Sequence, residues 1–139
     1  MLKNLIIVFA LLTVQAAACN MQDQTSPKTP PAEYKIPPEA ANHRNPVSPS
    51  PVSLARAKKI YGWDCAMCHG KAGDGKGDIT DLKGMVDFTD PGALKVYTDG
   101  ELFYMIQKGK GDMPPEGDRA KSEDLWNLVN YVRSFAKKK

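Results

Sequence analysis

The residues with the clearest chemical potential lie in one short stretch of this 139-residue chain, where positions 65–69 read Cys-Ala-Met-Cys-His. Two thiols spaced three positions apart on one turn can add to the two vinyl groups of a porphyrin, forming thioethers. The histidine that follows then lies beneath the porphyrin iron as its proximal ligand. The pattern therefore predicts one covalently bound haem c, attached through Cys65 and Cys68 and ligated by His69.

Three other kinds of site also use a Cys-x-x-Cys pair. A thioredoxin-like dithiol requires a βαβ pattern around the cysteines, and a zinc site requires two further ligands at suitable spacing. The sequence offers neither pattern. A structural disulfide stays open as an alternative, although it gives no role to His69.

A methionine is the expected sixth ligand of the iron. Met113 lies in residues 108–115, Lys-Gly-Lys-Gly-Asp-Met-Pro-Pro, where two glycines end a predicted helix and two prolines stiffen the following loop. Met105 falls on the apolar stripe of that helix, so we expect it in the core. Met85 follows a glycine in a loop and is the alternative ligand.

These features resemble the class I, His/Met-ligated monohaem cytochromes c, and in particular their bacterial lipoprotein type. The resemblance covers residues 53–136. It implies an all-α fold, a small cytochrome c-like arrangement of three to four helices around one covalently bound haem. It also supports Met113, in a Met-Pro loop like that of the family, as the distal iron ligand.

Further positions match the family pattern. Ala57 and Tyr61 occupy the small and aromatic positions eight and four residues before the first haem cysteine, and Tyr131 occupies the aromatic position of the terminal helix. We expect these side chains to pack in the core. Trp63 and Trp126 are also expected in the core, with a position at the haem edge or the helix junction as the alternative. No catalytic residue is predicted.

Capping patterns indicate where the predicted helices begin. Ser53 is a suitable N-cap for a helix before the haem motif, and Ser122 for the terminal helix. Thr98 with Glu101 three positions later forms a capping-box pattern for the helix between them.

Residues 70–78 alternate glycine with charged side chains. They follow no predicted strand, which excludes a phosphate-binding loop, and Lys76 stands where a calcium-binding loop needs an oxygen ligand. We therefore expect a turn at the haem edge. No proline follows His69 within twenty residues, so a backbone carbonyl near residues 75–78 is the predicted hydrogen-bond acceptor for its imidazole.

Residues 1–18 have the pattern of a secretory signal peptide, with one early cation, an apolar run and three alanines before Cys19. The apolar run is interrupted too early for a membrane-spanning helix. Ala-Ala-Ala-Cys resembles the bacterial lipobox, although Ala16 replaces its usual leucine. We therefore expect lipidation of Cys19, with ordinary cleavage after Ala18 as the alternative.

Residues 19–52 are predicted to form the lipid anchor and a proline-rich tether. Eight of the 11 prolines lie here and no glycine does. At about 3.1 Å per residue, an extended tether reaches roughly 100 Å. The alternative, that this segment is a proline-rich ligand for a partner protein, is less consistent with the sequence, because no repeated P-x-x-P spacing is present. Residues 53–139 are the predicted cytochrome c domain.

The predicted function is one-electron transfer by a membrane-tethered carrier in a respiratory chain, exported to the periplasmic side. The expected partners are redox proteins, such as a quinol-oxidising complex or a terminal oxidase. The alternatives are a haem subunit fixed in a larger respiratory complex and, less consistent with the sequence, a peroxidase or gas-binding protein. The net charge is only +3, and we expect no nucleic-acid partner and no small-molecule substrate.

Overall fold

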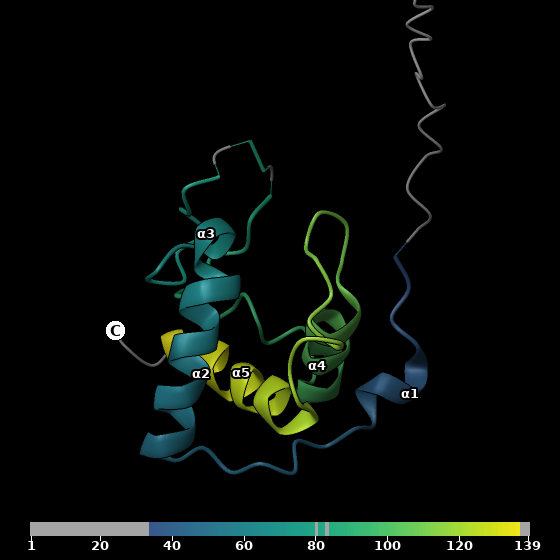
Figure 1. The fold of residues 1–139 in the computed structure, drawn as a ribbon. Helices are drawn as coiled ribbons and strands as arrows, with labels where there is room; N and C mark the ends of the chain where they lie inside the picture. The colour runs from purple at the N-terminus through teal and green to yellow at the C-terminus, as the bar shows by residue number, and fades with distance from the viewer. Residues whose placement is uncertain (1–33, 80, 83, 137–139) are drawn as a thin grey trace, which may run out of the picture. The chain divides into compact units, whose positions relative to one another are not determined.

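The computed structural model describes residues 34–79, 81–82 and 84–136. The predicted signal peptide and Cys19 lie outside these residues. The described chain forms five helices (Figure 1): α1 (Pro38–Ala41), α2 (Pro51–Asp64), α3 (Ala66–His69), α4 (Asp99–Lys108) and α5 (Ser122–Phe135). The predicted all-α class is confirmed; the helix count exceeds the predicted three to four because α1 and α3 are short, four-residue helices. No helix in the described ranges is both long and apolar enough to cross a membrane.

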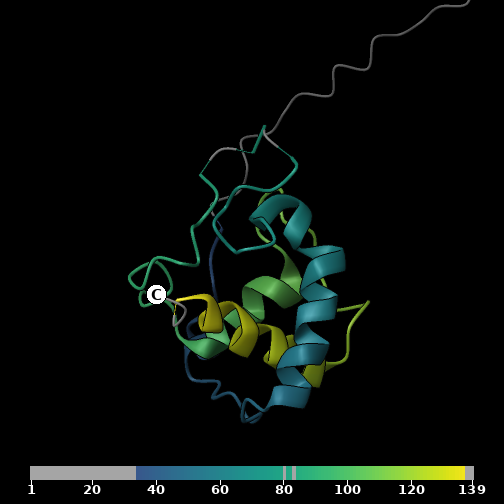
Figure 2. The same ribbon diagram turned by 90° about the vertical axis from the view of Figure 1, so that its left-hand side faces the viewer.

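The core of the fold lies where α2 crosses α5, and this crossing is visible in both ribbon views (Figures 1 and 2). Ala57 on α2 and Val129 on α5 are fully buried in one hydrophobic cluster. The rings of Tyr61 and Tyr131 meet edge to face with centroids 5.3 Å apart. The predicted contact between the aromatic residues of the first and terminal helices is therefore confirmed.

The beginnings of the helices agree only in part with the predicted caps. α4 begins after Thr98, and the predicted capping box with Glu101 is present. The prediction of Ser53 as an N-cap is wrong, because Ser50 caps α2 and Ser53 is its capping-box partner three positions later. Pro51 explains the shift, since proline favours the first position of a helix, where no donor is lost.

The prediction of Ser122 as an N-cap is also wrong, because Ser122 is the first helical residue of α5 and Lys121 precedes it as N-cap. The first turn of α5 is instead tied to α2. Arg56 donates to Asp124 from Nη2 to Oδ2 over 2.8 Å and also from Nε to Oδ1. This hydrogen bonding holds the pKa of Asp124 below its usual value.

Residues 34–50 form an N-terminal strap that leads from α1, beside α4, to the beginning of α2 (Figure 1). Asn45 Nδ2 donates to Asn130 Oδ1 over 3.0 Å, and Asn130 Nδ2 donates to the carbonyl of Val47 over 2.9 Å. Gly100 permits the close approach of α1, because a Cβ there would overlap the carbonyl oxygen of Ala40. The strap is thus bonded to the helices.

This strap lies within the predicted tether of residues 19–52. Its proline content favours a tether, yet Tyr34, Ile36 and Val47 pack against the hydrophobic cluster. An extended proline-rich segment makes few hydrogen bonds within itself, so it can lie along a folded surface that supplies side-chain partners. The compact unit therefore begins upstream of Ser53 and includes the strap.

Removing the amide of Asn130 should release the strap. In Asn130→Ala, we expect trypsin to cleave after the exposed Arg44 roughly tenfold faster, because about two hydrogen bonds no longer hold the strap closed. Peptide masses over a digestion time course measure this rate. The control is Asn42→Ala at an exposed strap position, and equal rates in the two variants would contradict the role of Asn130.

Candidate haem-binding site

The Cys-x-x-Cys-His motif forms a single turn that continues α2 almost without a break. The N–H of Cys65 donates to the carbonyl of Tyr61 over 3.0 Å, and the N–H of His69 donates to the carbonyl of Cys65 over 2.9 Å. Both cysteines are free and partly buried. The structure therefore places two free thiols and an imidazole on one turn, as the sequence predicted.

The end of this turn is fixed by Tyr61. Its buried hydroxyl donates to the carbonyl of Gly70 over 2.8 Å, and burial raises the pKa of this tyrosine. Gly70 has φ of +76°, a conformation that side-chain-bearing residues rarely adopt. The same ring packs against Phe135 of α5 with centroids 5.2 Å apart. The orientation of the turn thus depends on the α2–α5 crossing.

The His69 side chain stacks on Phe88, with ring centroids 4.8 Å apart and an angle of 25° between the planes. Burial lowers the pKa of this imidazole, which favours the neutral form that binds metals. Its Nδ1 is buried and has no hydrogen-bond partner among the described residues. The predicted acceptor near residues 75–78 is therefore not observed; instead, the N–H of Gly75 donates to the carbonyl of His69 over 3.0 Å.

The glycine-rich segment after the motif packs back on the turn. The N–H of Ile79 donates to the carbonyl of Met67 over 3.1 Å, and the N–H of Phe88 donates to the carbonyl of Gly73 over 2.7 Å. Gly77 lies so close to the motif that a Cβ there would overlap the Met67 carbonyl. The predicted turn is present, and it holds both the motif and Phe88.

The predicted sixth ligand lies in a tight loop after α4. The N–H of Lys110 donates to the carbonyl of Met113 and the N–H of Met113 donates to the carbonyl of Lys110, both over 3.0 Å. Met113 is partly buried against the hydrophobic cluster, whereas Met105 is in the core as expected. Met85 is also partly buried, so ligation by Met113 stays a prediction.

An acidic group near Cys65 was not found from the sequence. Glu116 is only 4% exposed, and its carboxylate accepts a hydrogen bond from Arg119, which also lies 3.5 Å from Asp64. Burial, followed by these two carboxylates, raises the pKa of the Cys65 thiol to about 12. Glu116 follows two prolines in a polar loop, and nothing in this local sequence predicts that its side chain is buried.

The two tryptophans differ in their exposure to solvent. Trp126 is 7% exposed and stacks on Phe103 with centroids 4.1 Å apart, so its predicted burial is confirmed. Trp63 is 74% exposed on α2, so the described chain does not bury it; its alternative position at the haem edge stays a prediction. It lies on the side of the helix away from Tyr61, which packs against α5.

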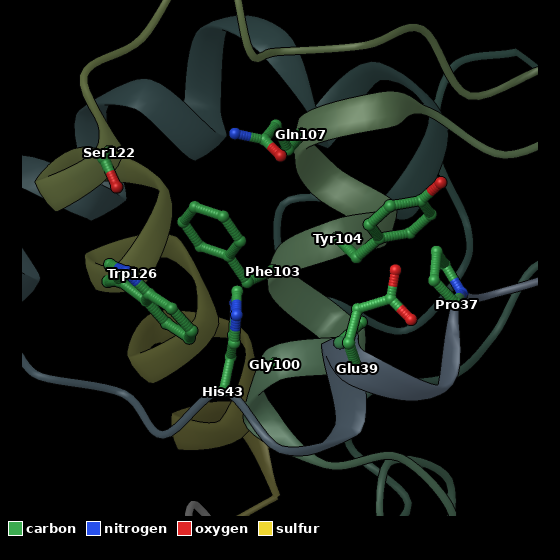
Figure 3. A pocket seen from close by; sticks show the side chains of 10 residues that line it. Pro37, Glu39, His43, Gly100, Phe103, Tyr104, Gln107, Ser122 and Trp126 are labelled. Carbon is green, nitrogen blue, oxygen red and sulfur yellow. The ribbon is translucent and has the colours of Figure 1, made fainter.

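A cavity of about 390 Å³ lies between the strap, α4 and α5, and not at the haem motif (Figure 3). The exposed His43, which the sequence placed in the tether, is one of its lining residues. In the part of the chain that the structure describes, no cluster of three or more His, Cys, Asp or Glu side chains could hold a metal ion.

The residues of the motif turn fit a covalently bound haem. The donor set consists of two free thiols on one turn and a histidine with a lowered pKa. The Nδ1 of His69 is buried and has no hydrogen-bond partner among the described residues, which leaves the hydrogen-bonding capacity of this ring unsatisfied without a bound group.

Comparison with known proteins agrees with this site. A family model described as cytochrome c oxidase, cbb3-type, subunit III matches residues 52–132. Cytochrome c6 of Pyropia tenera is 31% identical over 85 residues, covering 61% of this chain and 95% of that protein. The chloroplastic cytochrome c6 of Chlamydomonas reinhardtii is 30% identical over 90 residues, and the chain spans 56% of its length.

Two solved structures have a similar fold. The c-type cytochrome KustC0563 is 28% identical, with a TM-score of 0.52, covering 57% of this chain and 95% of that one. A chain of the Kuenenia stuttgartiensis reducing HAO-like protein complex has a TM-score of 0.55 at 24% identity, covering 65% of this chain and 46% of its own. The second likeness concerns the fold alone.

The hydrogen bond from Tyr61 to the motif turn can be tested by Tyr61→Phe. We expect the free energy of unfolding to fall by about 1–3 kcal/mol, because the buried carbonyl of Gly70 loses its donor. Urea unfolding of the mature protein measures this change. Tyr104→Phe, at a partly buried ring, is the control, and an equal effect in both variants would contradict the assigned contact.

Proposed function

Because this chain belongs to the class I c-type cytochromes, we propose that it is a membrane-tethered, exported electron carrier of a respiratory chain. Family membership itself implies a c-type haem electron carrier with one covalently bound haem c, and not an enzyme. The observation that carries the proposal is the motif turn, with two free thiols followed by a partly buried imidazole whose pKa is lowered by burial.

The residues of the chain hold and shield the redox centre. When bound, the haem supplies one-electron chemistry by cycling its iron between Fe(II) and Fe(III). Cys65 and Cys68 would hold it covalently, and His69 would be the proximal iron ligand. Phe88 keeps the imidazole plane in place through its stacking contact. No substrate pocket is required for this role.

Met113 is the proposed distal ligand. Its loop is closed by two backbone hydrogen bonds and stiffened by Pro114 and Pro115, so its thioether is held in a limited range of positions. As an iron ligand together with His69, the Met113 thioether would raise the reduction potential and would leave no open iron site for small molecules. This ligation favours electron transfer over a peroxidase or gas-binding role.

The proposed tether runs from an acylated Cys19 to the strap. Acylation would remove an odd thiol and anchor the protein stably at a membrane. Because the strap is packed from residue 34 onward, the stretch between it and Cys19 is residues 20–33, whose length allows a reach of at most about 50 Å. The domain would thus work close to membrane-bound partners, such as a quinol-oxidising complex or a terminal oxidase.

A second candidate function is that of a fixed subunit of a larger respiratory complex. It is favoured by the description of the matched family, an oxidase subunit. Purification after mild detergent extraction distinguishes the two functions, because a fixed subunit would migrate with its partners at high salt whereas a free carrier would separate.

Substituting Met113 tests the ligand assignment. In Met113→Ala, we expect loss of the weak far-red charge-transfer band of methionine-ligated ferric haem and a lower reduction potential, because the thioether is removed. Absorption spectroscopy and a redox titration measure both effects. Met85→Ala is the matched control; loss of the band there, with retention in Met113→Ala, would assign the ligand to Met85.

Substituting Cys19 tests the tether. In Cys19→Ser, we expect the exported protein to move from the membrane fraction to the soluble fraction, because no thiol is available for acylation. Immunoblotting of the two fractions after a high-salt wash measures the distribution. A protein that stays on the membrane after this substitution would show that Cys19 is not its anchor.

A further inference from the structure

Lys110 lies between two tyrosine rings that come from different parts of the fold. Its Nζ is 5.6 Å from the ring centroid of Tyr34 and 5.5 Å from that of Tyr97. Both distances are within the range in which an ammonium group is attracted by the π electrons of an aromatic ring. We call these three residues the lysine clasp.

The clasp is directly connected to the proposed iron ligand. Lys110 and Met113 exchange two backbone hydrogen bonds, so a movement of one residue shifts the other. Gly109, at φ of +77°, sits so close that a Cβ there would press on the carbonyl oxygen of Met113. The lysine and the methionine therefore belong to one tight loop with little freedom between them.

The two tyrosines are held by the core. The carbonyl of Tyr97 accepts a hydrogen bond from Arg133 Nη2 of α5 over 2.7 Å. Tyr34 is partly buried against the hydrophobic cluster, and its hydroxyl is buried. Tyr34 also belongs to the strap, which Asn45 and Asn130 tie to the same helix. Tyr97 is thus bonded to α5 directly, and Tyr34 is connected to α5 through the strap.

We propose that Lys110 is a positioning residue that couples the N-terminal strap to the distal ligand Met113. With Tyr34 in place, the lysine holds the loop in the position from which Met113 would ligate the iron. When Tyr34 moves away, the loop loses one of its two aromatic contacts and the methionine is displaced more readily. The inference rests on the proposed ligation by Met113, and it links the state of the tether to the redox site.

Competition by imidazole tests this coupling in the mature ferric protein. Free imidazole replaces the methionine and abolishes its charge-transfer band, so the apparent Kd includes the ease with which Met113 leaves. We expect Tyr34→Leu to lower this Kd roughly two- to fivefold and Lys110→Gln roughly five- to tenfold, since the first removes one cation–π contact from the loop and the second removes both. The double variant should lower the Kd no further than Lys110→Gln alone, because that substitution already removes the contact with Tyr34.

Matched variants separate positioning from general effects. Lys110→Arg keeps a cation between the rings and Tyr34→Phe keeps the ring, so both should retain the wild-type Kd. Lys108→Gln removes the same charge from an exposed position two residues earlier and should also leave the Kd unchanged. An equal decrease in Lys108→Gln would overturn the proposal, because it would show an effect of net charge alone.

The outcomes also separate this inference from the proposed function. If the wild-type protein has the band and the Lys110 and Tyr34 variants keep its imidazole Kd within twofold, the clasp is overturned and ligation by Met113 stands. If the wild-type protein lacks the band, the ligand assignment and the clasp both fail. Additive effects of the two substitutions would contradict a shared contact.

Discussion

The contact between α2 and α5 is the constraint on which the rest of the structure depends. The fully buried Ala57 lets the two helices approach closely, and Tyr61 then directs its hydroxyl to the end of the motif turn. From this crossing a series of aromatic contacts continues through Phe135 and Phe88 to the ring of His69. The imidazole is therefore positioned by packing that begins at the helix crossing.

The parts of the fold that were predictable are those specified by local chemistry. The spacing of the two cysteines and His69 specifies a single turn, and Thr98 with Glu101 specifies the beginning of a helix from neighbouring atoms alone. Ser53 and Ser122 were assigned wrongly as caps because each lies within three residues of the true boundary, where propensity does not discriminate.

The parts that were not predictable depend on contacts distant in sequence. The strap lacks the periodicity of a helix or strand, and its attachment depends on the amide of Asn130, more than eighty residues away. Glu116 is buried in a loop that has no periodicity to predict it, and the exposure of Trp63 follows from which face of α2 meets α5. The Lys110 contacts join two tyrosines that no local pattern connects.

The central claim is that the motif turn holds one covalent haem. Peptide mass mapping of the mature, exported protein tests it most directly, by digestion without reducing agent and fragmentation of the peptide that contains residues 65–69. The account predicts a single haem adduct spanning Cys65 and Cys68 and no disulfide. A peptide with two free thiols or a disulfide, and no haem, would contradict it.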